Sequence, residues 1–392
     1  MWTIDYSDLS ERDLESLQAK VWDGTEPLKV FIADILPHDL QAKKDMEDRM
    51  VELENLVTSF WGVVILEHVQ KKSIPDYKTY IGGGKLDEIM REMHLQWANL
   101  LVIWNILKPH QMFNLNTELK NIWAVAWDRV DLILKIFEKN AKTEETKLQI
   151  ELAAIKHMWP RIFNMGMELW KQAGKWSGET NTEIMKRHLA TREKEIRKKL
   201  AGYSKVRETH RQWRKKKWFL TVGIVGYTNA GKSTLLNALT NKWVLAEDKL
   251  FATLWTSVWK MWIAPETQKE WEYVPWKEVL LSDTIGFIRD LPPELVDAFA
   301  STLEDSIESE LLFHVVDASD PKMDEKLRVV DDILDKIWAA QQRIYVFNKT
   351  DMISGHALIE LKKRFFKKEA LYISTYTRAW FDDIVQCMLD YS

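Results

Sequence analysis

The first 140 residues alternate short apolar runs with segments whose apolar residues recur at helical spacing. Continuous apolar runs favour buried strands, and a period of three to four residues favours helices. Such alternation predicts an α/β domain with a largely parallel sheet. The predicted strands are 28–33, 61–66 and 100–104, and the predicted helices are 39–57 and 86–93.

The pattern becomes wholly helical after this region. Apolar residues recur at helical spacing over 148–162, where Pro160 is expected to break the helix. The periodicity resumes over 184–200, and Gly202 is expected to interrupt it. Two helices joined by a glycine-containing loop predict a helical hairpin or coiled-coil arm over 142–216.

A second α/β unit is predicted from residue 217 to residue 392. Its strand-like runs are separated by helical stretches, which indicates a doubly wound, mostly parallel sheet. The chain is therefore expected to comprise an N-terminal α/β domain (1–141), the helical arm (142–216) and a doubly wound domain (217–392). The predicted strands of the last domain are 219–225, 279–281, 312–316, 344–347 and 371–373.

A phosphate-binding loop lies between the first strand of the second unit and the helix that follows. The motif G-x-x-x-x-G-K-[ST] uses glycine so that backbone N–H groups can close around phosphate oxygens. Its lysine, Lys232, neutralises the β- and γ-phosphates, and Ser233 supplies a hydroxyl to Mg²⁺. The helix N-terminus adds further donors. The predicted loop comprises Gly226, Tyr227, Thr228, Asn229, Ala230, Gly231, Lys232, Ser233 and Thr234.

A D-x-x-G motif follows a predicted strand about fifty residues later. Asp283 can hold Mg²⁺, and the N–H of Gly286 can contact the γ-phosphate. Between the two motifs, Phe251, Ala252 and Thr253 are predicted to form a switch loop at the nucleotide. Thr253 is expected to bind Mg²⁺, with Thr256 as the competing candidate. Lys232, Thr253 and Gly286 are the predicted catalytic residues.

The sequence Asn348-Lys349-Thr350-Asp351 matches the guanine motif N-K-x-D. The Asp351 carboxylate can accept two hydrogen bonds from guanine N1–H and its 2-amino group, and adenine offers no such pair. Asn348, Lys349 and Asp351 are therefore predicted to bind the base. Ser374 and Thr375, after the last strand, are predicted to support it. The predicted ligands are GTP or GDP with Mg²⁺.

Composition narrows the setting of this chemistry. One cysteine, Cys387, excludes an internal disulfide and fits a reducing compartment. Because no apolar run approaches about 18 residues, no membrane span is expected, and the predicted location is cytoplasmic. Residues 186–217 carry 14 Lys and Arg against three Glu, whereas the whole chain has a net charge of −4. This segment is either an RNA-binding surface or a solvated helical face. The chain also has 20 tryptophans, an unusually large number.

These motifs, with the residues around them, resemble the HflX family of ribosome-associated GTPases. The resemblance covers nearly the whole chain. Within the GTPase domain it rests on 226–233, 250–254, 283–292 and 314–321, and outside it on 80–86, 128–134 and 178–180. It implies a protein that hydrolyses GTP, binds the large ribosomal subunit and its RNA, and splits or rescues stalled ribosomes. A monomer is expected.

Phe287, Asn229, one glycine-rich segment and three departures from the family pattern qualify this expectation. Phe287 stands where many GTPases place a water-orienting glutamine, so intrinsic hydrolysis is expected to be slow and stimulated by the ribosome. The alternative is an RNA adaptor or scaffold with negligible turnover. Asn229 occupies a position where related GTPases bind K⁺, or it braces the loop. The Gly82–Gly84 run is either a strand-to-helix turn or a phosphate contact. The three departures from the family pattern are Trp255, Trp176-Ser177 and Ser374-Thr375.

Overall fold

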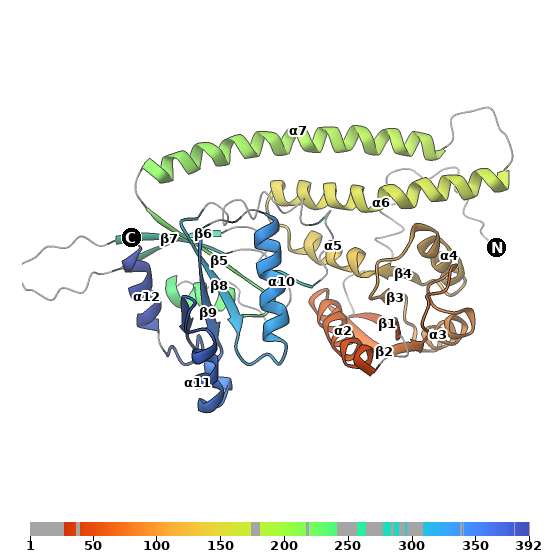
Figure 1. Cartoon of the computed structure of the whole chain (residues 1–392). Helices are drawn as coiled ribbons and strands as arrows, with labels where there is room; N and C mark the ends of the chain where they lie inside the picture. The colour runs from red at the N-terminus through yellow and green to blue at the C-terminus, as the bar shows by residue number, and fades with distance from the viewer. Residues whose placement is uncertain are drawn as a thin grey trace, which may run out of the picture. The chain divides into compact units, whose positions relative to one another are not determined.

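The chain forms two compact units in the computed structural model, and Figure 1 labels their elements. Unit 1 comprises Met1–Lys139 and Ile150–Arg197, and unit 2 comprises Asn140–Gln149 and Lys198–Ser392. The units share the predicted arm, and the three-part division of the chain remains a prediction. The structure describes residues 27–36, 40–173, 181–216, 219–240, 257–263, 277–283, 286–289, 295, 309–337, 339, 341–379 and 381–391.

Unit 1 contains a four-stranded, fully parallel sheet with the strand order β2-β1-β3-β4. The two inner strands are mostly apolar and mostly buried on both faces, as parallel strands covered by helices require. The predicted α/β domain is confirmed, and the structure adds β4, which was not predicted. The elements are β1 (Leu28–Leu36), α2 (Leu40–Ser59), β2 (Gly62–Lys71), α3 (Gly83–Gln96), β3 (Leu100–Ile103), α4 (Pro109–Leu119), η2 (Lys120–Ile122), β4 (Val125–Asp128) and α5 (Arg129–Asn140).

The glycine-rich segment forms the turn into α3. Gly82 is the N-cap residue, and its N–H donates to Gln70 Oε1 at 2.8 Å. A Cβ at Gly82 would lie 2.9 Å from Gln70 Nε2, so the flexible side chain of Gln70 would have to shift to admit one. Gly83 and Gly84 are the first helical residues. The strand-to-helix turn is therefore present, and a phosphate contact at this turn stays a prediction.

Two long helices, α6 (Glu144–Ala173) and α7 (Asn181–Lys216), form the predicted arm segment. The break expected at Pro160 and the interruption expected at Gly202 are both wrong, because each helix runs through its residue. Proline removes one intrahelical hydrogen bond, and contacts on both sides of Pro160 hold α6 helical. Glycine costs about 1 kcal/mol in a helix, which a 36-residue helix tolerates. No described helix is both long and apolar enough to cross a membrane.

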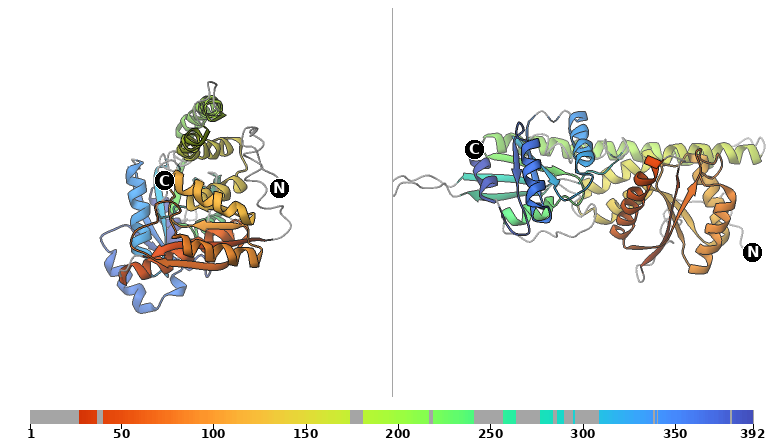
Figure 2. Two further views of the ribbon diagram at one scale, coloured as in Figure 1. Left: turned by 90° about the vertical axis from the view of Figure 1, so that its right-hand side faces the viewer. Right: turned by 60° about the horizontal axis from the view of Figure 1, so that its bottom comes forward.

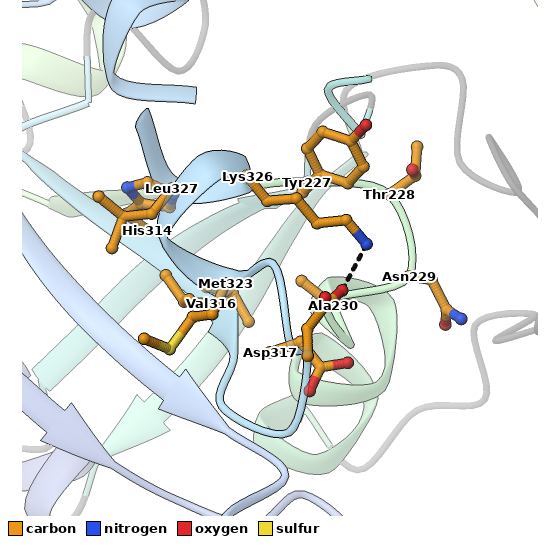
Figure 3. A pocket seen from close by; sticks show the side chains of 12 residues that line it. Tyr227, Thr228, Asn229, Ala230, His314, Val316, Asp317, Met323, Lys326 and Leu327 are labelled. Carbon is orange, nitrogen blue, oxygen red and sulfur yellow. Dashed lines mark hydrogen bonds and ion pairs between the residues drawn. The ribbon is translucent and has the colours of Figure 1, made fainter. Parts of the chain in front are cut away.

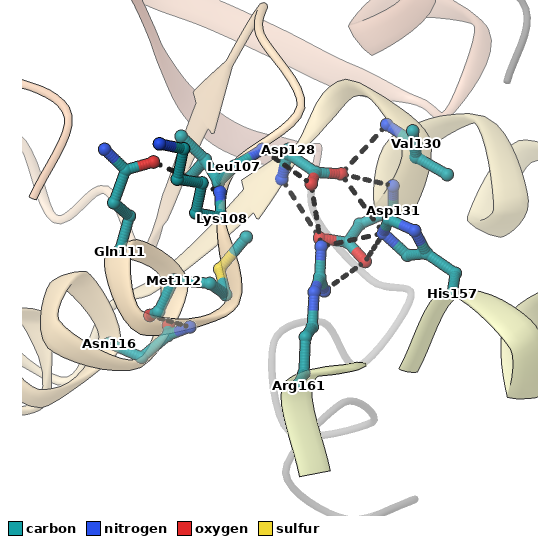
Figure 4. Close-up of polar contacts among 10 residues, drawn as sticks. All are labelled: Leu107, Lys108, Gln111, Met112, Asn116, Asp128, Val130, Asp131, His157 and Arg161. Atoms are coloured by element: carbon teal, nitrogen blue, oxygen red, sulfur yellow. Dashed lines mark hydrogen bonds and ion pairs between the residues drawn. The ribbon is translucent and has the colours of Figure 1, made fainter. Parts of the chain in front are cut away.

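A polar cluster within unit 1 surrounds the start of α5 (Figure 4). Asp128 Oδ1 accepts hydrogen bonds from the N–H groups of Val130 and Asp131, both at 3.0 Å, and thereby caps α5. The guanidinium of Arg161 donates to Asp128 Oδ2 and to Asp131 Oδ1, each at 2.7 Å. The cluster therefore attaches α6, at the residue that follows Pro160, to the end of β4.

His157 completes this cluster from the preceding turn of α6. Its Nε2 lies 3.5 Å from Asp128 Oδ1 and 3.4 Å from Asp131 Oδ1. Burial opposes protonation of His157, but the two carboxylates outweigh burial and raise its pKa from 6.5 to about 9. The stabilisation from His157 is therefore complete below pH 6.5 and is lost as the pH rises through about 9.

Replacing Arg161 with Gln should lower the stability of unit 1 by about 3 kcal/mol, because two carboxylates lose their cation in a buried setting. Urea unfolding followed by amide hydrogen exchange in α5 measures this loss. The control is Arg192→Gln, which removes a half-exposed ion pair with Glu151 and should change stability by less than about 1 kcal/mol. Equal effects of the two variants would contradict the structural role of the cluster.

Three tryptophans adopt a left-handed backbone that L-residues disfavour. The φ angles of Trp61, Trp97 and Trp123 are 74°, 55° and 59°. Each follows a helix end, and Trp97 and Trp123 are C-cap residues with 84% and 90% of their surface exposed. After Trp97, the N–H of Ala98 donates to the carbonyl of Met93, as in the helix ending that glycine usually forms. These residues therefore strain the backbone, and their exposed side chains contribute little to the hydrophobic core.

Trp97→Gly and Trp123→Gly should each raise stability by about 0.5–1 kcal/mol. The left-handed conformation costs an L-residue about 1–2 kcal/mol, and the greater freedom of glycine in the unfolded chain offsets part of that gain. Hydrogen exchange of α3 measures the first variant. Trp97→Ala retains the strained backbone and should give no gain, so an equal gain from alanine would contradict this account.

Unit 2 contains a six-stranded sheet with the order β10-β9-β8-β5-β7-β6, and Figure 2 gives two further views of it. All pairings are parallel except β6 with β7, so the predicted doubly wound, mostly parallel sheet is confirmed. The strands are β5 (Leu220–Gly226), β6 (Ser257–Ile263), β7 (Lys277–Asp283), β8 (Leu311–Asp317), β9 (Gln342–Asn348) and β10 (Ala370–Tyr372). The helices include α8 (Lys232–Thr240), α10 (Met323–Lys336), α11 (Gly355–Arg364) and α12 (Phe381–Asp390).

The strand order defines where a ligand can bind. From β5 the chain passes to β7 on one side and then crosses to β8 on the other, so the connections diverge at the carboxyl end of β5. Ligands of doubly wound sheets bind at this kind of divergence. The phosphate loop lies there, directly after β5.

Candidate nucleotide site

Two glycines allow the phosphate loop to lie against the neighbouring strands. A Cβ at Gly226 would lie 2.3 Å from the carbonyl oxygen of Val315 on β8, and one at Gly231 would lie 2.2 Å from Asn348 Nδ2 on β9. Both glycines have positive φ angles, 155° and 94°. The loop between β5 and α8 thus requires glycine both for its backbone conformation and for the space around it.

Lys232 is buried at the first position of α8, and its ammonium group points back into the loop. Nζ donates to the carbonyl oxygens of Gly226 at 3.1 Å and Tyr227 at 2.8 Å. Burial lowers the pKa of Lys232 from 10.5 to about 8, and the charge of Asp283 offsets part of that shift. The loop therefore holds a partly desolvated cation where phosphate charge would accumulate.

Ser233 and Asp283 meet across the site from α8 and β7. The Ser233 hydroxyl donates to Asp283 Oδ2 at 2.9 Å, and Asp283 is fully buried at the end of its strand. A hydroxyl and a carboxylate are hard oxygen donors, which suit Mg²⁺ held jointly with phosphate oxygens. The donor set therefore fits the predicted ion. The third predicted ligand, Thr253, lies outside the described residues, as do Phe251, Ala252 and Thr256.

The segment after the D-x-x-G glycine is paired with the phosphate loop. The N–H of Thr228 donates to the carbonyl of Phe287 at 2.8 Å, and the N–H of Phe287 donates to the carbonyl of Gly226 at 3.1 Å. A Cβ at Gly286 would lie 2.9 Å from Lys232 Nζ. The structure thus brings both predicted catalytic residues that it describes, Lys232 and Gly286, into direct proximity.

The guanine motif is attached to the same loop. Asn348 Nδ2 donates to the carbonyl of Ala230 at 3.0 Å, and Asn348 Oδ1 accepts the N–H of Thr375 at 3.1 Å. The Ser374 hydroxyl donates to Asp351 Oδ1 at 2.5 Å. The predicted base-binding residues from β9 and the loop after β10 therefore lie together, with the Asp351 carboxylate oriented by a neighbouring hydroxyl.

Asp317 was not predicted as a site residue, although it belongs to this arrangement. Its Oδ2 lies 2.6 Å from Lys349 Nζ, and Lys349 has a left-handed backbone with φ of 60°. The carboxylate at the end of β8 thus orients the lysine of the guanine motif from the adjacent strand. The sequence held a signal for this role, because Asp317 directly follows the predicted strand 312–316, as Asn348 directly follows the predicted strand 344–347.

Two loop residues remain at the rim of the site. Asn229 has φ of 63°, and its exposed side chain points away from the other residues in Figure 3. Thr234 is exposed on α8. A cavity of about 60 Å³ lies on the α10 side of the loop and is lined by Tyr227, His314 and Lys326, among others. This volume holds one or two waters and is too small for a nucleotide.

The fold and these motifs define a P-loop GTPase. Three family descriptions match consecutive parts of the chain: "GTP-binding GTPase N-terminal" over 47–138, "GTP-binding GTPase Middle Region" over 140–214, and "50S ribosome-binding GTPase" over 221–349. The chain is 42% identical over 312 residues to GTPase HflX of Caldanaerobacter subterraneus subsp. tengcongensis, covering 78% of this chain and 70% of the relative.

Similarity extends to GTPase HflX of Escherichia coli, with 36% identity over 355 residues that cover 88% of this chain and 79% of the relative. The chain belongs to the HflX family of GTPases. Among solved structures, the GDP complex of SsGBP matches with a TM-score of 0.55 at 25% identity, covering 93% of this chain and 98% of that one. A GTP-binding protein from Sulfolobus solfataricus with GDP matches at 0.51 and 25% identity, covering 93% and 100%. The predicted family and its GTP-binding, GTP-hydrolysing class are confirmed.

Nucleotide binding should be accompanied by proton uptake near pH 8. Lys232 is about half protonated there in the free protein, and the added phosphate charge favours its protonated form. Calorimetric titration with GDP in two buffers of different ionisation enthalpy measures the uptake. At pH 6.5 the uptake by Lys232 should vanish, because the lysine is already charged. Identical proton uptake at both pH values would contradict the lowered pKa of Lys232.

Proposed function

We propose that this GTPase uses Mg²⁺·GTP to control its association with the large ribosomal subunit, in the cytoplasm, and that it acts in ribosome splitting or rescue. The observation that carries the proposal is the row of exposed Lys and Arg side chains on α7. Phosphate contacts by such side chains provide affinity for RNA that does not depend on sequence. The exposed cations within the described part of α7 include Lys194, Arg197, Lys198, Lys199 and Lys205.

Five described residues at the nucleotide site have proposed roles in binding and hydrolysis. Lys232 neutralises the β- and γ-phosphates, and the N–H of Gly286 contacts the γ-phosphate. Ser233 and Asp283 would hold Mg²⁺, which would offset the negative charge of the phosphates. Asp351 accepts hydrogen bonds from guanine. The role of Thr253 as a further Mg²⁺ ligand is proposed from the sequence alone.

Slow intrinsic hydrolysis is part of the proposal. Phe287 follows Gly286, its side chain is buried, and a phenyl ring cannot accept or donate a hydrogen bond to an attacking water. The chain therefore requires another group to orient that water, and the ribosome is the proposed source. A second function, an RNA adaptor that binds GTP with negligible turnover, is favoured by the same observation.

Sedimentation with purified large subunits tests the first function. Binding is expected with a non-hydrolysable GTP analogue and to be weaker with GDP. The double variant Lys198→Glu/Lys205→Glu should weaken binding, and its salt dependence should flatten by about one unit of slope for each phosphate that is no longer neutralised. Lys363→Glu, an exposed lysine on α11, is the control and should leave binding unchanged.

Absence of binding in either nucleotide state at low salt would refute the ribosome partner. Phosphate release in a single turnover, with and without ribosomes, separates the two functions. Stimulation by ribosomes supports the ribosome-dependent GTPase. Binding without any phosphate release supports the adaptor.

A K⁺ requirement is also proposed. The Asn229 amide is exposed at the rim of the phosphate loop, where its oxygen is available to a monovalent cation beside the phosphates. Hydrolysis measured in KCl should be faster than in NaCl of equal concentration, and Asn229→Ala should abolish the difference. An unchanged rate after exchange of K⁺ for Na⁺ in the unmodified protein would remove this proposal.

A further inference from the structure

The side chain of Tyr227 joins the phosphate loop to the segment after the D-x-x-G glycine. Its hydroxyl accepts the backbone N–H of Arg289 at 2.8 Å, and the residue is 7% exposed. The phosphate-loop motif allows any residue at this position, so neither the motif nor phosphate binding explains a buried phenol. Together with the two backbone bonds that pair Thr228 and Gly226 with Phe287, the phenol makes a third link along residues 287–289.

The first turn of α10 contacts both partners of this link. Glu325 Oε1 lies 3.0 Å from Arg289 Nη1, and Lys326 Nζ lies 5.0 Å from the centre of the Tyr227 ring. Figure 3 shows Lys326 beside Tyr227 at the cavity next to the loop. The ring is thus held on one side by α10 while its hydroxyl holds the backbone of Arg289. The link belongs wholly to unit 2 and does not involve the guanine motif.

We propose that Tyr227 is a positioning residue for GTP, which acts through its hydroxyl to keep Gly286 at the phosphate loop. Gly286 immediately precedes the paired segment and lies against Lys232, so its N–H can approach a γ-phosphate only if residues 287–289 stay in place. GDP lacks the γ-phosphate and does not need that N–H. The hydroxyl should therefore favour GTP over GDP. The proposal rests on the GTPase class of the protein and not on ribosome binding.

Tyr227→Phe removes the hydroxyl and keeps the ring, so it is the direct test. The ratio of affinities for a non-hydrolysable GTP analogue and for GDP should fall about 3- to 10-fold, the effect of losing one ordinary hydrogen bond. Affinity for GDP should change less than twofold. The single-turnover rate of GTP hydrolysis should fall by a similar factor, and the KM for GTP should rise by the factor that the GTP affinity falls, because hydrolysis is slow.

Tyr345→Phe is the matched control, since it also removes a tyrosine hydroxyl from unit 2. That hydroxyl donates to Asp331 Oδ2 at 3.0 Å and so joins β9 to α10. The bond does not involve residues 287–289. The control should leave the affinity ratio unchanged even if it lowers stability. Equal ratios for Tyr227→Phe, Tyr345→Phe and the unmodified protein would overturn the proposal, and this outcome is independent of whether ribosomes bind.

A second inference concerns the tryptophans with left-handed backbones. The chain has 20 Trp and only 14 Gly among 392 residues, whereas glycine averages about 7% of proteins, or about 27 residues in such a chain. Three of the seven non-glycine residues with positive φ in the described part of the chain are Trp61, Trp97 and Trp123. A bulky residue in this conformation is a genuine outlier, and glycine is the residue that adopts it without strain.

We infer that the source cell inserts glycine at these three positions because it reads the codon UGA as glycine. The meaning of UGA differs between genetic codes. Peptide mass spectrometry of the protein purified from its source should detect glycine masses at positions 61, 97 and 123, and the gene should have UGA there. Tryptophan masses at these positions, or UGG codons, would overturn the inference.

Discussion

The close approach of two glycines to neighbouring strands is the constraint on which the nucleotide site depends. Gly226 lies against the backbone of β8 and Gly231 against Asn348 of β9, at distances that leave no room for a Cβ. These contacts place the loop at the carboxyl edge of the sheet, where the connections diverge. Three interactions follow from this placement. They are the hydrogen bond from the Lys232 ammonium group to the loop carbonyl, the Ser233–Asp283 pair and the bond from Asn348 to Ala230.

Because the phosphate loop lies so close to the neighbouring strands, the three nucleotide motifs are connected to one another by hydrogen bonds. Phosphate loop, D-x-x-G segment and guanine motif are each hydrogen-bonded to another of the three, so the three segments are joined by direct contacts around the place of the phosphates. Lys232 carries the electrostatic part of this arrangement, because burial makes its charge unfavourable until phosphate is present. Tyr227 and α10 extend the network to the segment that follows Gly286.

Unit 1 is organised around a different polar centre. The Asp128 carboxylate caps α5 and receives the guanidinium of Arg161, so the start of one helix and the middle of another depend on a single side chain. This explains why the resemblance over 128–134 contains acidic residues beside a buried apolar helix face. It also explains why α6 stays helical through Pro160, which lies between two residues of the cluster.

The sequence by itself determined the α/β class of both units, the parallel sheets and the three nucleotide motifs, because apolar periodicity and motif spacing are local properties. It did not determine β4 or the antiparallel β6, because their pairing with β3 and β7 is a tertiary contact. Nor did it predict the continuity of α6 and α7, where tertiary contacts outweigh the local effects of proline and glycine. Only the tertiary structure brought Asp317 to Lys349 and Tyr227 to Arg289, because those pairs are separated by 32 and 62 residues in the chain.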